Sequence, residues 1–290
     1  MDTRFAALDV VQLTATLREH GYIADRGLAT ALLLSMKLGK PLLLEGEVGV
    51  GKTQLAKTVA EMLTRELIRL QCYEGIDMYH ALYEWDYARQ MLHIRALGQT
   101  ADADDDTNLF SERFLVERPL LKATRAGDRC VLLIDEIDRA DDEFEAFLLE
   151  LLGDFQVTIP EVGTVQSATP PIVILTSNRT RELHDALKRR CLYSWIGFPD
   201  EQREVEIVRT RAPQVSESLV TQVVAAVHRL RAMELEKLPG IAETIDWTES
   251  LSAIEADTLN EGNALDTLGA VVKDRDDLEF ATRNIRDVVS

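Results

Sequence analysis

Short runs of apolar residues alternate with segments of helical periodicity over the first two thirds of the chain. Such runs are typical of strands buried on both faces, and we expect strands at Pro41–Glu45, Leu67–Gln71, Cys130–Ile134, Ile172–Thr176 and Tyr193–Ile196. Between these runs, apolar residues recur every three or four positions, as they do on one face of an amphipathic helix. The alternation predicts an α/β fold in which helices flank a parallel five-stranded sheet.

The helical periodicity is clearest in three segments, one before the first expected strand, one after it, and one before the fourth. The apolar positions that define them are Leu28, Leu32 and Met36, then Leu55, Val59, Met62 and Leu63, and then Phe144, Phe147, Leu148 and Leu151. Strand patterns end at Gly197-Phe198-Pro199, and only helical patterns follow. We therefore expect an α/β domain over residues 1–198 and a smaller all-helical domain over residues 199–290.

A glycine-rich segment follows the first expected strand and fits the pattern GxxxxGK[ST]. It reads Gly46-Glu47-Val48-Gly49-Val50-Gly51-Lys52-Thr53. The N–H groups of such a loop converge on a phosphate, where the start of the next helix adds partial positive charge. The lysine then reaches the β- and γ-phosphates, and the threonine hydroxyl binds Mg²⁺. With a strand before it and an amphipathic helix after it, the segment predicts a site for Mg-ATP.

Two carboxylates end the apolar run CVLLIDEID. Asp135, at the end of the expected strand, is suited to hold Mg²⁺ beside a phosphate loop, usually through water. Glu136 is then suited to orient and polarise an attacking water. A strand that ends in solvated acids is common by itself, but the upstream phosphate loop favours the catalytic interpretation.

Polar residues also follow the fourth expected strand. Asn178 stands at its carboxyl end, the edge at which parallel sheets bind ligands, and its amide can bond a phosphate or the lytic water. An ordinary turn residue is the alternative. Downstream, Lys188-Arg189-Arg190 offers an arginine that could stabilise transition-state charge on a neighbouring subunit. Spacing alone favours a solvated basic helix end instead.

The charge balance bears on the class of partner. The chain carries 50 acidic and 32 basic side chains, for a formal charge of −18 and a pI near 4.7. Such a surface repels phosphate backbones and disfavours nucleic acid as the main partner. The acidic run at residues 101–108 predicts a solvated loop. Cys72, Cys130 and Cys191 show no metal-ligand spacing, and we expect them to be reduced core residues.

The amino-terminal segment does not have the pattern of a signal peptide, and the apolar runs are too short to span a membrane. We therefore expect a cytoplasmic protein.

The motifs GEVGVGKT, VLLIDEID, ILTSN and ALKRRC, in this order, resemble those of AAA+ ATPases. The longer stretches PLLLEGEVGVGKTQLAK, LIRLQCYEGID, ALYEWDYARQML and AETIDW resemble the MoxR group, which includes ATPases similar to those that mature carbon-monoxide dehydrogenase. The resemblance covers residues 21–251 and implies an αβα core with a helical lid, assembled into a ring, typically a hexamer. ATP would then bind at subunit interfaces.

The resemblance also implies roles for individual residues. Asn178 corresponds to the sensor 1 residue, and Arg190 to the arginine finger, with Arg189 as the alternative. The segment Phe155–Gln166 corresponds to a hairpin inserted before the sensor 1 strand, and the segment after Cys72 to a second insertion. In this group the ATPase remodels a partner, commonly a von Willebrand factor A domain protein, and the client is a metal- or cofactor-containing enzyme.

One departure from the family pattern leaves alternatives open. The stretch Ala242–Trp247 contains no arginine where many relatives place sensor 2. An ATP-gated scaffold with little turnover is therefore an alternative, and a nucleic-acid-associated ATPase is a further one that the charge disfavours. Tyr22 and Ile23 are candidates for the adenine pocket. The aromatic residues Tyr83, Trp85 and Tyr87 indicate either a partner-binding surface or buried packing.

Overall fold

The computed structural model describes residue 5, residues 7–97 and residues 109–290. The acidic run at residues 101–108 lies outside the described residues. The amino-terminal elements are α1 (Val10–Glu19), α2 (Arg26–Leu38), β1 (Leu42–Gly46), α3 (Lys52–Met62) and β2 (Glu66–Gln71). Next come α4 (Met78–Ala81), β3 (Tyr83–Trp85), α5 (Tyr87–Leu97), β4 (Leu115–Glu117), α6 (Pro119–Ala126), β5 (Cys130–Asp135) and α7 (Asp142–Asp154).

The remaining strands and the carboxyl-terminal helices follow. They are β6 (Gln156–Ile159), β7 (Gly163–Gln166), β8 (Ile172–Ser177), α8 (Asp185–Arg190), β9 (Leu192–Ile196), α9 (Glu201–Arg211), α10 (Glu217–Ala232), α11 (Ile241–Ala253), α12 (Glu261–Thr267), α13 (Arg275–Arg283) and α14 (Ile285–Val289). The described residues group into two compact units. The first unit contains the described residues up to Leu8, together with Thr30–Leu44 and the described part of Val59–Ser194. The second unit contains Asp9–Ala29, Glu45–Thr58 and Trp195–Ser290.

Five strands form the main sheet in the order β2-β5-β8-β1-β9. The strand β5 pairs in parallel with β2 and β8, and Gln71 lies opposite Asp135. The strands β1, β5 and β8 are buried at every position, which is why their sequences are almost wholly apolar. All five expected strands are confirmed to within one residue at either end.

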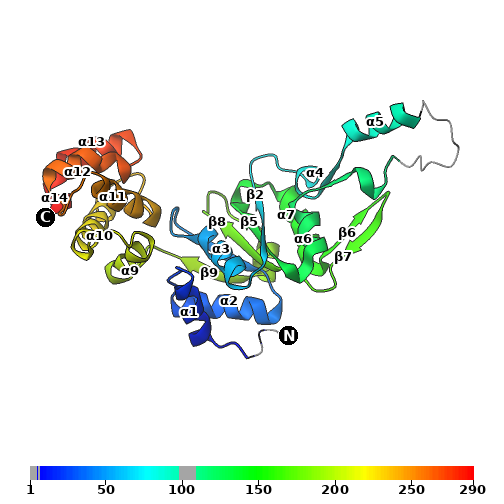
Figure 1. Ribbon diagram of the computed structural model, residues 1–290, viewed down its shortest axis with the longest axis horizontal. Coiled ribbons are helices and arrows are strands. Elements are labelled where there is room, and N and C mark those ends of the chain that lie inside the picture. Colours follow the sequence, from blue (N-terminus) through cyan, green and yellow to red (C-terminus); the bar gives the residue numbers. More distant parts are fainter. Residues whose placement is uncertain (1–4, 6, 98–108) are drawn as a thin grey trace. The chain divides into compact units, whose positions relative to one another are not determined.

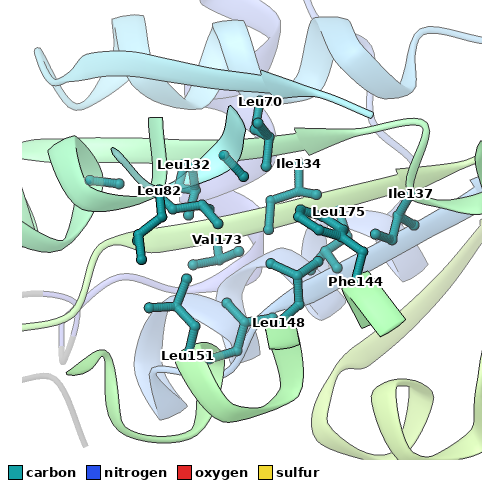
Figure 2. Close-up of a cluster of buried hydrophobic side chains, with 14 of the residues drawn as sticks. Leu70, Leu82, Leu132, Ile134, Ile137, Phe144, Leu148, Leu151, Val173 and Leu175 are labelled. Atoms are coloured by element: carbon teal, nitrogen blue, oxygen red, sulfur yellow. The ribbon is translucent and has the colours of Figure 1, made fainter. Parts of the chain in front are cut away.

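A large hydrophobic cluster lies within the first unit. Side chains of β2, β5 and β8 pack there against α6 and α7 (Figure 2). The helix α7 contributes Phe144, Leu148 and Leu151, the stripe expected from its periodicity. A side-chain oxygen of Asp141 accepts a hydrogen bond from the Phe144 N–H and caps the helix start.

Two short ladders stand apart from the main sheet in the first unit. The expected hairpin is present as the antiparallel pair β6 and β7 (Figure 1). The expected second insertion contains α4, β3 and α5, with β3 paired to β4. Of its aromatic residues, Tyr83 is buried against Trp85, which fits the interpretation as buried packing. Tyr87 is 66% exposed on α5, which fits the interpretation as a partner-binding surface.

From Asp200 to the carboxyl terminus the regular elements are helices, as expected, and α9 to α14 lie together at the yellow-to-red end of Figure 1. Leu219, Val223, Val227 and Leu230 of α10 pack around Trp247 of α11, which is fully buried. The Trp247 indole N–H donates to the Thr267 hydroxyl at 2.8 Å, so its one polar group is satisfied. Among the described residues, helices of the length and hydropathy that a bilayer crossing requires do not occur.

Candidate functional site

The glycine-rich segment turns from the end of β1 into the start of α3, as expected. Lys52 is buried, and its ammonium donates to the carbonyl oxygens of Gly46 at 2.9 Å and Glu47 at 2.6 Å. Thr53 follows in the first turn of α3 and is half-buried. The lysine therefore lies within the curve of its own loop, at the start of α3.

The loop makes a close main-chain contact with the start of α11. The Ile241 N–H donates to the Gly49 carbonyl at 3.1 Å. Gly49 has φ +76, a conformation that side chains disfavour. A Cβ built on Gly240 would lie 2.8 Å from both Gly49 Cα and the Val48 carbonyl oxygen. Glycine is thus required at both positions, and the first turn of α11 touches the phosphate loop.

A cavity of about 200 Å³ adjoins this contact, wholly within the second unit. Its wall is mostly apolar and is formed by the loop, the segment before α2, the end of β9, α9 and α11. The main lining residues are Tyr22, Ile23, Gly49, Val50, Gly51, Gln54, Ile196, Pro199, Arg203, Ile207, Arg211, Ile241 and Ile245. A space of this size beside a phosphate loop suits a nucleobase better than a whole nucleotide.

Arg203 fixes one wall of the cavity. Its guanidinium donates to the Ile23 carbonyl at 2.9 Å and to the Asp25 carboxylate at 3.1 Å. Burial opposes ionisation of Asp25, but the Leu28 N–H and Arg203 outweigh it and lower the Asp25 pKa below its ordinary value. Burial also raises the pKa of Tyr22, so its hydroxyl stays neutral. Arg203 is therefore held in place by Asp25 and by the Ile23 carbonyl.

A buried carboxylate joins the three helices behind this wall. Glu204 of α9 is fully buried and accepts from both terminal nitrogens of Arg231 at 2.6 and 2.8 Å. It also bonds His228 of α10 at 2.9 Å and the Thr244 hydroxyl of α11 at 2.7 Å. We refer to these four residues as the Glu204 cluster. Because every partner comes from α10 or α11, the cluster fixes α9 against both helices.

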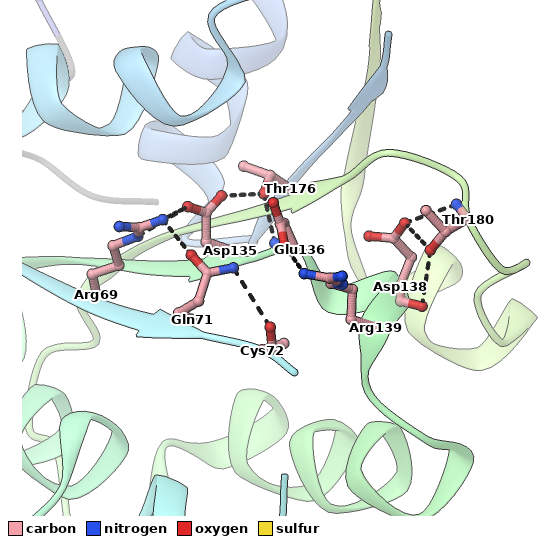
Figure 3. Close-up of polar contacts among 9 residues, drawn as sticks. All are labelled: Arg69, Gln71, Cys72, Asp135, Glu136, Asp138, Arg139, Thr176 and Thr180. Carbon is pink, nitrogen blue, oxygen red and sulfur yellow. Dashed lines mark hydrogen bonds and ion pairs between the residues drawn. The ribbon is translucent and has the colours of Figure 1, made fainter. Parts of the chain in front are cut away.

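In the first unit, Asp135 is the last residue of β5 and is buried. Arg69 of β2 donates to its Oδ2 from Nε at 2.9 Å and from Nη2 at 2.6 Å (Figure 3). The Thr176 hydroxyl of β8 donates to Oδ1 at 2.5 Å. The carboxylate is therefore oriented and held from both neighbouring strands.

Glu136 follows with φ +55, a strained conformation for a residue with a side chain. Its N–H donates to the Thr176 hydroxyl at 2.9 Å, and its carboxylate pairs with Arg139 at 3.2 Å (Figure 3). Backbone strain of this kind occurs most often at functional sites. The turn directs the two successive carboxylates to different partners, Asp135 to Arg69 and Glu136 to Arg139.

Asn178 directly follows β8 and is half-buried, at the strand end where it was expected. The loop after it is tied to the segment after β5. Asp138 accepts from the Thr180 N–H at 2.8 Å and from its hydroxyl at 2.7 Å. The buried Glu145 bonds Arg181 and accepts from the His184 N–H at 2.9 Å. The loop that carries Asn178 is thus anchored at two points.

The basic helix end is the last turn of α8, where Arg189 and Arg190 are both exposed. The Arg190 guanidinium donates to the Leu149 carbonyl of α7 in the same chain. The structure therefore places Arg190 against α7, and its role towards another subunit stays a prediction.

Burial raises the pKa of all three cysteine thiols, which disfavours the reactive thiolate form. Cys72 and Cys130 are buried, as expected, whereas Cys191 is only partly buried. Burial raises the pKa of Cys72 to about 12, helped by the negative charges of Asp135, Asp138 and Glu136. Among the described residues, groups of three or more acidic, histidine or cysteine side chains arranged to hold a metal ion do not occur.

Several residues of these two sites have no sequence motif that identifies them. Arg69, Arg203 and the Glu204 cluster act through contacts between distant segments, which sequence spacing does not report. Gly240 carries a weak signal, because it precedes a helix whose Glu243 bonds back to its N–H at 2.9 Å, a helix-capping pattern.

Comparison with known proteins agrees with these motifs. The AAA domain (dynein-related subfamily) matches residues 41–191. An uncharacterized protein of Staphylococcus saprophyticus is 25% identical over 205 residues, covering 68% of this chain and 71% of its own. One of Staphylococcus haemolyticus is 24% identical, covering 80% and 85%. One of Staphylococcus aureus is 26% identical, covering 68% and 70%.

Solved structures show the same fold. A mutant of RuvB from Thermotoga maritima superposes with a TM-score of 0.51 at 18% identity, covering 96% of this chain and 77% of that one. A second mutant of the same protein has the same score and identity, covering 91% and 74%. At this identity the likeness shows the fold alone: a parallel five-stranded sheet with flanking helices, followed by a helical region.

Proposed function

Because the chain is an ATPase that belongs to the dynein-related subfamily of AAA domain proteins, we propose that it uses hydrolysis of Mg-ATP to remodel a partner protein. The observation that carries this proposal is the phosphate loop with its adjoining cavity. The loop holds a buried lysine, and the mostly apolar cavity opens beside Gly49, Val50 and Gly51. Phosphates would bind the loop N–H groups while the base enters the cavity, beside Tyr22 and Ile23.

Each motif residue has one role in this proposal. Gly46 to Gly51 cradle the phosphates, Lys52 contacts the β- and γ-phosphates, and Thr53 and Asp135 hold Mg²⁺. The residues fit such a cation, since a threonine hydroxyl and an oriented carboxylate are hard oxygen donors. Bound Mg²⁺ would neutralise charge that develops on the phosphates.

The remaining residues would act on the reaction itself. Glu136 activates the attacking water, Asn178 orients it or the γ-phosphate, and Arg190 of a neighbouring copy stabilises the transition state. The last role requires a ring, and AAA+ ATPases commonly assemble as rings. We propose a hexamer built from a nucleotide-binding domain at residues 1–198 and a helical lid at residues 199–290.

The finer proposal is a MoxR-type ATPase. It rests on the longer sequence stretches, among them the one that gives β2 and Cys72 and the one that gives β3 and α5. The partner would be a von Willebrand factor A domain protein and the client a metalloenzyme, in the cytoplasm. The hairpin of β6 and β7 and the insertion with α5 would then act on that partner.

ATP hydrolysis should be measured for the wild type, Lys52→Ala and Glu136→Gln, over a range of protein concentrations with mass determination in parallel. We expect activity to rise as rings form, Lys52→Ala to be inactive, and Glu136→Gln to retain ATP without turnover. Wild-type turnover by Glu136→Gln would show that the assigned base is wrong.

One observation favours a second candidate, an ATP-gated scaffold with little turnover. The Glu136 carboxylate is paired with Arg139 at 3.2 Å, so another side chain already engages it. The absence of an arginine from Ala242–Trp247 points the same way. Client maturation in cells by Glu136→Gln would decide: maturation at the wild-type level supports the scaffold, and its loss supports the remodelling ATPase.

A further inference from the structure

Arg69 holds the carboxylate that is expected to face the nucleotide's cation. Arg69 and Gln71 lie on the same face of β2, and Gln71 is directly opposite Asp135 in the parallel register. The guanidinium therefore reaches along the strand and meets Oδ2 with two N–H groups, while Nη2 also contacts the Gln71 side chain (Figure 3).

The hydrogen bonds leave Asp135 little free capacity. A carboxylate has about four acceptor positions, and two are taken by Arg69 and one by Thr176. The Asp135 side chain is 3% exposed, whereas that of Arg69 is 48% exposed. A positive charge in contact with a buried carboxylate cancels much of its attraction for any second cation.

We propose that Arg69 is a positioning residue that opposes cation binding at Asp135, so that Mg²⁺ binds well only when nucleotide phosphates add their own negative charge. The proposal rests on the function proposed above. It assigns two effects to one side chain: Arg69 fixes the orientation of Asp135, and it raises the Mg²⁺ concentration that the site requires.

Two substitutions separate these effects. Arg69→Met removes the charge and both hydrogen bonds but keeps a long apolar stem, and Arg69→Lys keeps the charge without the planar fork. Lys122→Met is the matched control. Lys122 pairs with Glu66 at the start of the same strand and is similarly exposed, so this variant removes one positive charge without touching Asp135.

The measurement is a Mg²⁺ titration of fluorescent ADP binding by the full chain, with circular dichroism to verify folding of each variant. We expect the half-saturating Mg²⁺ concentration to fall on the order of tenfold in Arg69→Met. Arg69→Lys and Lys122→Met should stay within about twofold of the wild type. A merely structural ion pair would lower the stability of Arg69→Met but leave its Mg²⁺ requirement unchanged.

The possible failures are distinguishable. If wild-type ADP binding depends on Mg²⁺ but Arg69→Met needs as much or more of it, the role of Arg69 is wrong and the proposed function stands. If Mg²⁺ has no effect on ADP binding by the wild type, the assignment of Asp135 within the proposed function is wrong, and the role of Arg69 is wrong with it.

Discussion

The contact between Gly49 and Gly240 gives a sharp prediction for the substitution Gly240→Ala. Alanine suits the φ of −83 at this position, so backbone strain is absent and only the steric effect remains. Its Cβ would lie 2.8 Å from Gly49 Cα and the Val48 oxygen, whereas nonbonded carbon atoms prefer about 3.5–4.0 Å. The loop and α11 must therefore separate by about 0.7 Å or more.

That separation has a calculable energetic cost. It stretches the Ile241–Gly49 hydrogen bond from 3.1 Å to beyond the normal range, a loss of about 1 kcal/mol. Overpacking adds about 1–3 kcal/mol. We expect Gly240→Ala to lower the free energy of unfolding by about 2–4 kcal/mol in total.

Urea denaturation followed by far-ultraviolet circular dichroism measures this change, with Gly269→Ala as the control. A Cβ at Gly269 meets no atom of the described residues within 4 Å, so the same substitution there should be neutral or stabilise by up to about 1 kcal/mol. Equal stability of the two variants would refute the close approach of α11 to the phosphate loop.

Two further substitutions test the second unit. Glu204→Gln should lower the free energy of unfolding by about 3–5 kcal/mol, because it leaves Arg231 charged and nearly buried; adding Arg231→Met to the same chain should restore part of this loss. Urea denaturation measures the change, with Glu206→Gln, at a more exposed site, as the control. An equal loss of stability in Glu204→Gln and Glu206→Gln would contradict the prediction. Asp25→Asn should lower stability by at most about 1 kcal/mol, because the Asp25 side chain is 53% exposed. Because folding lowers the pKa of Asp25, the stability difference between the wild type and Asp25→Asn should be complete above pH 3.8. It should vanish as the pH falls through the lowered folded-state pKa. A stability difference that grows in acid would contradict this prediction.

The sequence predicts the elements of this fold well where burial is uniform. The strands β5 and β8 are buried at every position, so their apolar character alone identifies them. The strands β3 and β4 have three residues each, too few for a periodic pattern, and their pairing depends on a segment brought from elsewhere in the chain. For the same reason the second insertion could be located but its structure could not be predicted.

In the candidate sites, too, local motifs could be predicted from the sequence, whereas contacts between distant segments could not. The phosphate loop and the carboxylates of Asp135 and Glu136 follow from local spacing, because each motif lies within one strand–turn segment. Arg69 lies 66 positions from Asp135, and its contact depends on the order of strands in the sheet. The roles of Lys52, Glu136, Asn178 and Arg190 in catalysis stay predictions.

The Glu204 cluster has a mechanical consequence. One carboxylate bonds side chains from α10 and α11 while it belongs to α9, so the three helices cannot slide past one another without breaking several hydrogen bonds at once. The three helices therefore form one rigid group, and the first turn of α11 bonds this group to Gly49 of the loop. We therefore expect a displacement of the loop to move the three helices together, because the first turn of α11 is bonded to it.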